Sequence, residues 1–161
     1  MDRFTENALR LEMNDPASVL WGTFVLWLGW FGFTSGSSLG FSGADGVGAV
    51  QVAINTAISG AFGLLSGLIY SYFSNHGHVR VEAIATSLLS ALVTITPGCA
   101  YVQPWEAAIM GFTGALVGTA SCKGVDQVAF RLQLDDPVQA IGVHFMSGIW
   151  GMLCVGLFAN V

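Results

Sequence analysis

One histidine in the last long apolar stretch of this sequence has the residue type and the surroundings that chemistry requires. His144 lies in a segment with no charged residue from Pro137 to Val161. A neutral imidazole has one donor and one acceptor nitrogen, and it changes charge near neutral pH, so it can take up or release a proton. A titratable group inside a membrane-crossing segment is a functional hypothesis by default. We therefore predict that His144 is a site residue.

Three residues mark the start of the helix that carries this histidine. Asp136 is a good N-cap, Pro137 suits the first helical position, and Gln139 can reach back to the cap as in a capping box. Counted from Pro137 at about 1.5 Å per residue, His144 is expected about 11 Å along the helix. That position is near the middle of a hydrocarbon core about 30 Å thick.

A second group of side chains with binding chemistry lies in the first apolar run. Phe33 follows several aromatic residues, and four hydroxyl residues come directly after it, at Thr34, Ser35, Ser37 and Ser38. In a helix that starts near Ala17, Phe33 is about 24 Å along, close to the outer surface. Aromatic faces attract cations and hydroxyl oxygens accept hydrogen bonds, so such a site above a membrane-embedded histidine suits a small cation that sheds its charge. Alternatively, the aromatics form an interfacial belt and the serines cap a helix end.

The elements that position these residues are predicted to be transmembrane helices. The chain is 53% hydrophobic and only 9% charged, and its charge-free runs cover residues 17–44, 46–79, 83–105, 107–122 and 138–161. Most runs approach or exceed the length of about 20 residues that a spanning helix needs. The third is broken at Pro97-Gly98, and the fourth is the weakest because it needs Glu106 or Lys123 to snorkel. We expect an all-α polytopic membrane protein with five transmembrane helices.

The basic residues predict the orientation of these helices. Five spans put the N-terminal segment, the second loop and the fourth loop on one side, and all the basic residues then fall there: Arg3, Arg10, Arg80, Lys123 and Arg131. By the positive-inside rule this side is cytoplasmic. We expect a cytoplasmic segment at residues 1–16 and a transmembrane domain at residues 17–161, with the N-terminus of this chain inside and the C-terminus outside.

Small residues recur at the spacing that lets membrane helices pack closely. Such pairs are Gly32/Gly36, Gly36/Gly40, Gly63/Gly67, Gly114/Gly118 and Ser147/Gly151. Small residues four apart allow close backbone approach in lipid, which predicts a tightly packed bundle. The three cysteines lack paired spacing, and His76 and His78 have no other ligands nearby, so we expect neither a disulfide framework nor a metal site.

Two long motifs carry a family resemblance. The run from Gly29 to Ser37 reads Gly-Trp-Phe-Gly-Phe-Thr-Ser-Gly-Ser, and residues 135–151 contain Asp-Asp-Pro-Val, Val-His and Gly-Ile-Trp-Gly. They resemble the Gly-Trp-Phe-Gly-Phe-Asn-x-Gly-Ser and Asp-Asp-Pro…Val-His…Gly-Ile-Trp-Gly signatures of the ammonium transporters of the Amt/MEP/Rh superfamily, on the Amt side. Residues 52–56 and 95–100 are also similar to family segments, in the same order. The resemblance covers residues 14–160.

The resemblance implies a role for each matching residue. His144 would be the second of two paired pore histidines, Phe33 one of two stacked phenylalanines that gate the pore, Ser37 part of an external ammonium site, and Leu26 part of the apolar lumen. Ammonium would then be concentrated outside, lose its proton and cross as ammonia or with the proton relayed separately, because a charged ion pays heavily to enter an apolar pore. Thr34 departs from the family pattern, which usually has Asn there.

The resemblance also implies that this chain is the second of two inverted five-helix repeats in an eleven-helix fold. Met1 is then either an internal methionine or the start of a shortened gene. The expected partners are ammonium or ammonia, the lipid bilayer, the missing N-terminal half and, in a homotrimer, further subunits, in the plasma membrane. We expect no enzymatic activity, cofactor, metal or nucleic-acid partner. The alternatives are a truncated, non-transporting subunit that modulates full-length transporters, or an ammonium sensor.

Overall fold

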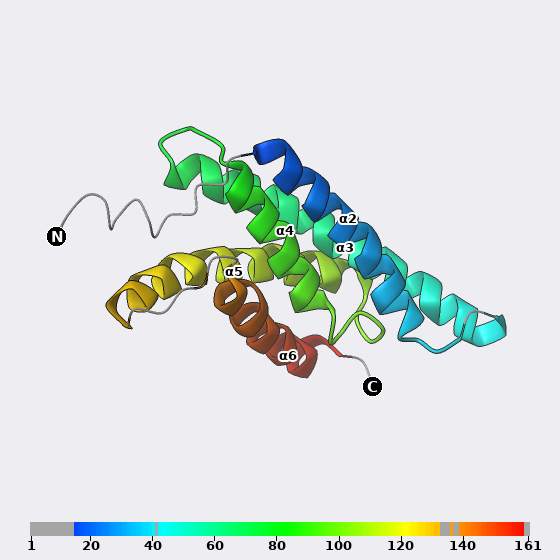
Figure 1. Ribbon diagram of the computed structural model, residues 1–161. Helices are drawn as coiled ribbons and strands as arrows, with labels where there is room; N and C mark the ends of the chain where they lie inside the picture. The colour runs from blue at the N-terminus through cyan, green and yellow to red at the C-terminus, as the bar shows by residue number, and fades with distance from the viewer. Residues whose placement is uncertain (1–14, 41, 133–135, 137–138, 160–161) are drawn as a thin grey trace.

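Five antiparallel helical segments form the structure, a computed structural model that describes residues 15–40, 42–132, 136 and 139–159 (Figure 1). The segments are α2 (Pro16–Gly36), α3 (Gly43–Ser74), α4 (Val81–Ile95), α5 (Pro104–Leu132) and the π-helix η1 (Ile141–Met146), which continues into α6 (Ser147–Phe158). Four of them are long and apolar enough to cross a membrane, and α4 is a shorter apolar helix. The predicted all-α architecture with five helices is confirmed.

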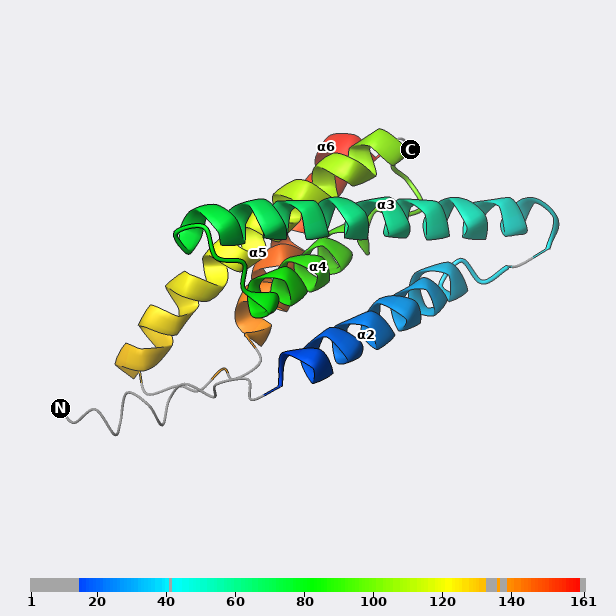
Figure 2. The ribbon, with the colours of Figure 1, turned by 90° about the horizontal axis from the view of Figure 1, so that it is seen from above.

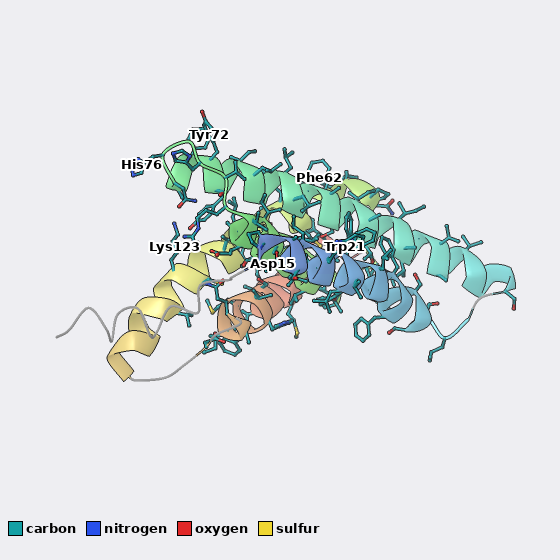
Figure 3. All side chains as sticks on the ribbon, turned by 45° about the horizontal axis from the view of Figure 1, so that its top comes forward. Asp15, Trp21, Phe62, Tyr72, His76 and Lys123 are labelled. Carbon is teal, nitrogen blue, oxygen red and sulfur yellow. The ribbon has the colours of Figure 1, made fainter. Side chains whose placement is uncertain are left out.

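The helices alternate in direction, so the start of α2 and the end of α6 lie at opposite ends of the bundle (Figures 1 and 2). The loop after α3 and the end of α5 lie on the same side as the start of α2. Figure 3 shows His76 and Lys123 on that side. Lys123 Nζ lies 4.9 Å from the centre of the Tyr70 ring, a cation–π contact that joins α5 to α3. This arrangement agrees with the predicted grouping of Arg80 and Lys123, while the assignment of that side to the cytoplasm stays a prediction.

The helix boundaries follow capping chemistry and proline. The Asp15 carboxylate accepts hydrogen bonds from the Ala17 backbone N–H at 3.0 Å and from Ser18 Oγ at 2.5 Å, which caps α2. Helix α4 ends at Ile95, before Pro97, as the sequence predicted. The prediction that the fourth run is the weakest span is wrong. Helix α5, which contains the fourth run, has 29 residues, whereas α4, which lies in the third run, has only 15.

Helices α3, α4 and α5 pack through glycines. A Cβ added at Gly63 would lie 2.4 Å from Ala91 Cβ, one at Gly111 would lie 2.3 Å from Ser59 O, and one at Gly114 would lie 2.1 Å from Thr94 Oγ1. Each distance is too short for a larger residue, so the predicted close approach is confirmed for these helices. The prediction of close packing is wrong for Gly32 and Gly36 of α2, because a Cβ added at either glycine would have no neighbouring helix within 4 Å among the described residues.

Many small polar side chains lie inside the bundle beside an apolar core, and many large apolar side chains lie on its surface. Buried polar side chains include Asn55, Ser59 and Ser90, while Leu28, Val50 and Leu157 are exposed. Buried hydroxyls bond mostly to helix carbonyls, as Ser59 Oγ does to Ala91 O at 3.0 Å. All three cysteines are buried, as expected of packing residues, and Cys99 and Cys154 belong to the apolar core. This inside-out distribution is what a lipid environment favours.

Candidate functional site

His144 of η1 is exposed and lines a shallow, wide-open apolar hollow on the bundle surface. The hollow has a volume of 570 Å³, and its other lining residues are Phe145, Gly148, Ile149, Met152 and Leu153. The histidine side chain is exposed at the surface of this chain. The described lining of the hollow contains no charged side chain besides the titratable imidazole itself, which has the donor and acceptor nitrogens to exchange a hydrogen bond or a proton with a small guest.

The π-turn determines which way His144 points. Gly142 and Val143 are buried, and a Cβ at Gly142 would lie 2.3 Å from Cys122 Sγ. Ser147 Oγ donates to the Gly142 carbonyl, five residues earlier, at 3.4 Å. In an unbroken α-helix, residues three and four before the buried Ser147 would share its face, which would bring position 144 toward the bundle. The wider turn brings Gly142, five residues before Ser147, to the buried face beside Val143, and leaves His144 exposed. π-turns within α-helices are common at functional sites.

The start of this helix differs from the prediction. Asp136 does act as a cap, because its carboxylate accepts from the backbone N–H groups of Ala140 at 2.8 Å and Ile141 at 3.0 Å. Pro137, predicted as the first helical residue, lies outside the described residues. The predicted capping box is wrong, because the Gln139 side chain accepts a hydrogen bond from Thr86 Oγ1 at 3.3 Å and Gln139 itself has a positive φ of 54°.

The turn that carries the histidine packs against the middle of α5. Helix η1 begins at Ile141, so His144 is closer to the start of its own helix than the count from Pro137 predicted. Ser147, one turn further, packs beside Gly118, where an added Cβ would lie 2.5 Å from Ser147 Oγ. Gly118 is the central residue of the long α5, so the neighbouring helix extends well beyond η1 at both ends.

The three candidate residues of α2 are all exposed. Leu26 and Phe33 have exposed fractions of 52% and 59%, and Ser37 is exposed at the end of the helix. Ser37 Oγ donates its proton to Phe33 O at 2.7 Å. Its oxygen lone pairs therefore remain available to accept a hydrogen bond from a small donor such as a protonated amine. The geometry is compatible with the predicted outer binding chemistry beside an aromatic ring.

The structure does not bring His144 into contact with the α2 residues. Helix α2 packs on α3 and α4, and α6 packs on α4 and α5; within the described residues α2 and α6 make no contact. Helix α4 lies between them (Figure 1). Its half-buried side includes Leu89 and Val93. The candidate residues therefore border α4 from two sides, and their pore roles stay predictions.

One pair of residues beside the candidate gate was given no role by the sequence. Trp30 Nε1 donates a hydrogen bond to Thr96 Oγ1 at 3.0 Å, and the Trp30 ring contacts the Phe33 ring edge to face. The two bonded residues are 66 positions apart, so no local pattern links them. Among the described residues, no group of three or more histidine, cysteine or acidic side chains is placed to hold a metal ion.

Electrostatic features outside the membrane-spanning segments are modest. The hydrogen bond from Ser18 Oγ, with that from the Ala17 N–H, lowers the pKa of the Asp15 carboxyl from its ordinary value. Arg80 and Glu82 form an exposed ion pair at the start of α4. Pairs of this kind contribute little to stability, so neither feature competes with His144 as a site for chemistry.

Comparisons with known proteins agree with the resemblance seen in the sequence. The Ammonium Transporter Family matches residues 1–161. The chain is 33% identical over 159 residues to a putative ammonium transporter 3 of Caenorhabditis elegans, covering 99% of this chain and 22% of that protein. Among solved structures, a protein described as "Sensor Amt Protein" superposes with a TM-score of 0.82 at 33% identity, over 91% of this chain and 34% of that one.

Candida albicans Mep2 is also similar in structure, with a TM-score of 0.79 at 28% identity over 91% of this chain and 30% of that one. The chain thus spans about a third or less of the length of each of these three proteins. Four of its described helices are long and apolar enough to cross a membrane, and the match extends over its whole length. The chain is therefore an integral membrane protein that belongs to the Ammonium Transporter Family, a family of transporters and not of enzymes.

Proposed function

We propose that this chain forms part of an ammonium transporter in which ammonia crosses the membrane through an apolar pore. In this pore, His144 forms a hydrogen bond with ammonia and passes a proton onward. The observation that carries the proposal is the exposure of His144 in an apolar hollow of 570 Å³. An imidazole placed there can accept a hydrogen bond from ammonia or donate one to it, and it can pass a proton onward. Family membership supports ammonium as the substrate.

The exposed end of α2 supplies the recognition step in this proposal. Ammonium binds beside the Phe33 ring by a cation–π contact and donates a hydrogen bond to Ser37 Oγ, whose own proton is already given to Phe33 O. Moving the charged ion further would take it into apolar surroundings at high cost, which favours release of the proton before entry. Leu26, also exposed on α2, then lines the apolar path.

The remaining wall of the pore is proposed to come from a further, N-terminal half of the transporter. Leu26, Phe33, Ser37 and His144 are exposed on this chain, and the chain spans about a third of the solved relatives. A titratable side chain left facing lipid is costly, so a protein partner opposite His144 is favoured. A homotrimer in the plasma membrane is part of the same proposal.

The test is His144→Ala in the protein expressed from its native open reading frame. We expect methylammonium uptake to fall or potassium to be admitted, with unchanged membrane insertion, because the imidazole is lost from the pore and not from a packing surface. The matched control is His78→Ala, which removes an exposed loop histidine on the side of the bundle where α3 ends. Uptake and potassium exclusion equal to those of the control would overturn the role of His144.

Likeness to the protein described as "Sensor Amt Protein" favours a second candidate, an ammonium sensor with the same helical fold. A sensor binds ammonium without sustained flux. Reconstitution in vesicles separates the two functions, because a transporter produces a pH change across the membrane when an ammonium gradient is applied. Saturable ammonium binding without such a change would favour the sensor.

A further inference from the structure

Trp30 and Thr96 connect α2 to the turn that follows α4. The indole Nε1–H donates to Thr96 Oγ1 at 3.0 Å, and the Thr96 hydroxyl donates its own proton to Leu92 O at 2.7 Å. The hydroxyl is thus oriented by its own helix, with a lone pair directed to the indole. Both side chains are half-buried, which makes the hydrogen bond stronger than one in water.

Phe33 rests against the indole that this hydrogen bond holds. The ring centres of Trp30 and Phe33 are 6.2 Å apart and their planes are inclined at 71°, which is an edge-to-face contact. Phe33 is 59% exposed, so more than half of its surface is not covered by packing within this chain, and Trp30 is the aromatic side chain that it contacts. The orientation of the phenylalanine therefore depends on the indole, and the orientation of the indole depends on Thr96.

We propose that Trp30 and Thr96 are positioning residues for Phe33, and that their hydrogen bond sets the orientation of the Phe33 ring. The inference rests on the proposed function, because it assumes that Phe33 gates the pore. Thr96 immediately precedes Pro97, in a turn whose carbonyls at Cys99 and Val102 are bonded by the buried Asn55 amide. The gate is thereby attached to a fixed part of the bundle.

The same chain contains a second hydrogen bond of the same chemistry, which serves as the control. Trp150 Nε1 donates to Thr113 Oγ1 at 3.0 Å, between α6 and α5, and Thr113 Oγ1 donates to Ile109 O at 2.8 Å. Neither Trp150 nor Thr113 contributes to the Phe33 ring contact. Loss of this bond removes a tryptophan–threonine hydrogen bond of the same type and length from the bundle and leaves the Trp30–Phe33 ring contact in place.

The experiment compares Thr96→Val with Thr113→Val, and Trp30→Phe with Trp150→Phe, in the protein from its native open reading frame. Methylammonium uptake and the thermal unfolding midpoint are measured for each. We expect Thr96→Val and Trp30→Phe to change uptake by about three- to tenfold, the factor that one neutral hydrogen bond supplies. The double variant should change it no further, because both substitutions remove the same bond. The control variants should shift the midpoint equally and leave uptake unchanged.

The Phe33→Ala variant shows whether Trp30 and Thr96 affect uptake through the Phe33 ring. In Phe33→Ala, we expect Thr96→Val to have no further effect on uptake, because there is no ring left to position. An effect of Thr96→Val that persists in Phe33→Ala, or that Thr113→Val reproduces, would overturn this inference alone. Wild-type uptake by Phe33→Ala itself would overturn the proposed gate, and the positioning role with it.

Discussion

Gly142→Ala tests whether the π-turn directs His144 outward. A Cβ at Gly142 would lie 2.3 Å from Cys122 Sγ, 2.9 Å from the Cys122 backbone nitrogen and 3.0 Å from its Cα. Two of these three atoms belong to the backbone of α5, which cannot rotate aside as a side chain can. The strain is relieved only when η1 moves away from α5, and His144 moves with it.

The expected magnitude follows from two opposing terms. Overpacking of a core costs about 1–3 kcal/mol, and a clash with backbone belongs at the upper end. Replacing glycine by alanine within a helix returns about 1 kcal/mol. The net loss is about 2 kcal/mol, which lowers the unfolding midpoint of a domain of this size by about 4–8 °C. A shift of the imidazole by about 1 Å is expected to lower transport by about 10- to 100-fold.

Gly156→Ala is the matched control, because Gly156 belongs to α6 and a Cβ there meets nothing within 4 Å. The unfolding midpoint in detergent and methylammonium uptake are measured for both variants of the protein from its native open reading frame. We expect loss of both quantities in Gly142→Ala and little change in Gly156→Ala. Equal midpoints and equal uptake in the two variants would refute the reasoning.

Two further predictions concern the ends of the bundle. Asn55→Ala removes an amide that donates to the Cys99 and Val102 carbonyls at 2.9 and 2.8 Å, so we expect the free energy of unfolding to fall by about 1–3 kcal/mol. The control is Gln51→Ala, which removes a longer hydrogen bond of 3.4 Å and should lower the unfolding midpoint less. The hydrogen bond from Ser18 lowers the pKa of Asp15, so its capping contribution is complete above the ordinary aspartate pKa and lost as pH falls through the lower folded-state value. Corrected amide exchange in the first turn of α2 should accelerate in that acidic window only, and Asp15→Asn should abolish this pH dependence.

The sequence predicted helix ends well where one residue decides them, and less well where a distant partner does. Pro97 acts locally, and α4 ends before it as expected. Helix α2 begins at Pro16, beside the expected start near Ala17, and its cap Asp15 is also a local signal that the prediction from sequence did not use. The fourth run was judged too short because it was cut at Glu106 and Lys123. Both charges are accommodated within α5, since Glu106 accepts from the Gln103 N–H at 2.7 Å and Lys123 lies over the Tyr70 ring.

The candidate site shows the same limit. The chemistry of His144 could be predicted from its residue type and apolar surroundings, but its orientation comes from a π-turn that depends on Cys122, on another helix. The spacing of glycines in the sequence does not show which of them pack against another helix. Gly32 and Gly36 face open space, whereas Gly114 packs against Thr94. The Trp30–Thr96 bond was missed for the same reason, because its partners are distant in sequence.

The shortness of α4 ties its insertion into the membrane to α3. Its 15 residues cover about 22 Å of a hydrocarbon core about 30 Å thick. The rest of the crossing is a turn whose carbonyls at Cys99 and Val102 are bonded by Asn55 of α3. Non-helical backbone at membrane depth is tolerated only where protein covers it. During synthesis α3 emerges before the turn, so its Asn55 amide is available to bond the turn, and we expect the two helices to enter the bilayer as one unit.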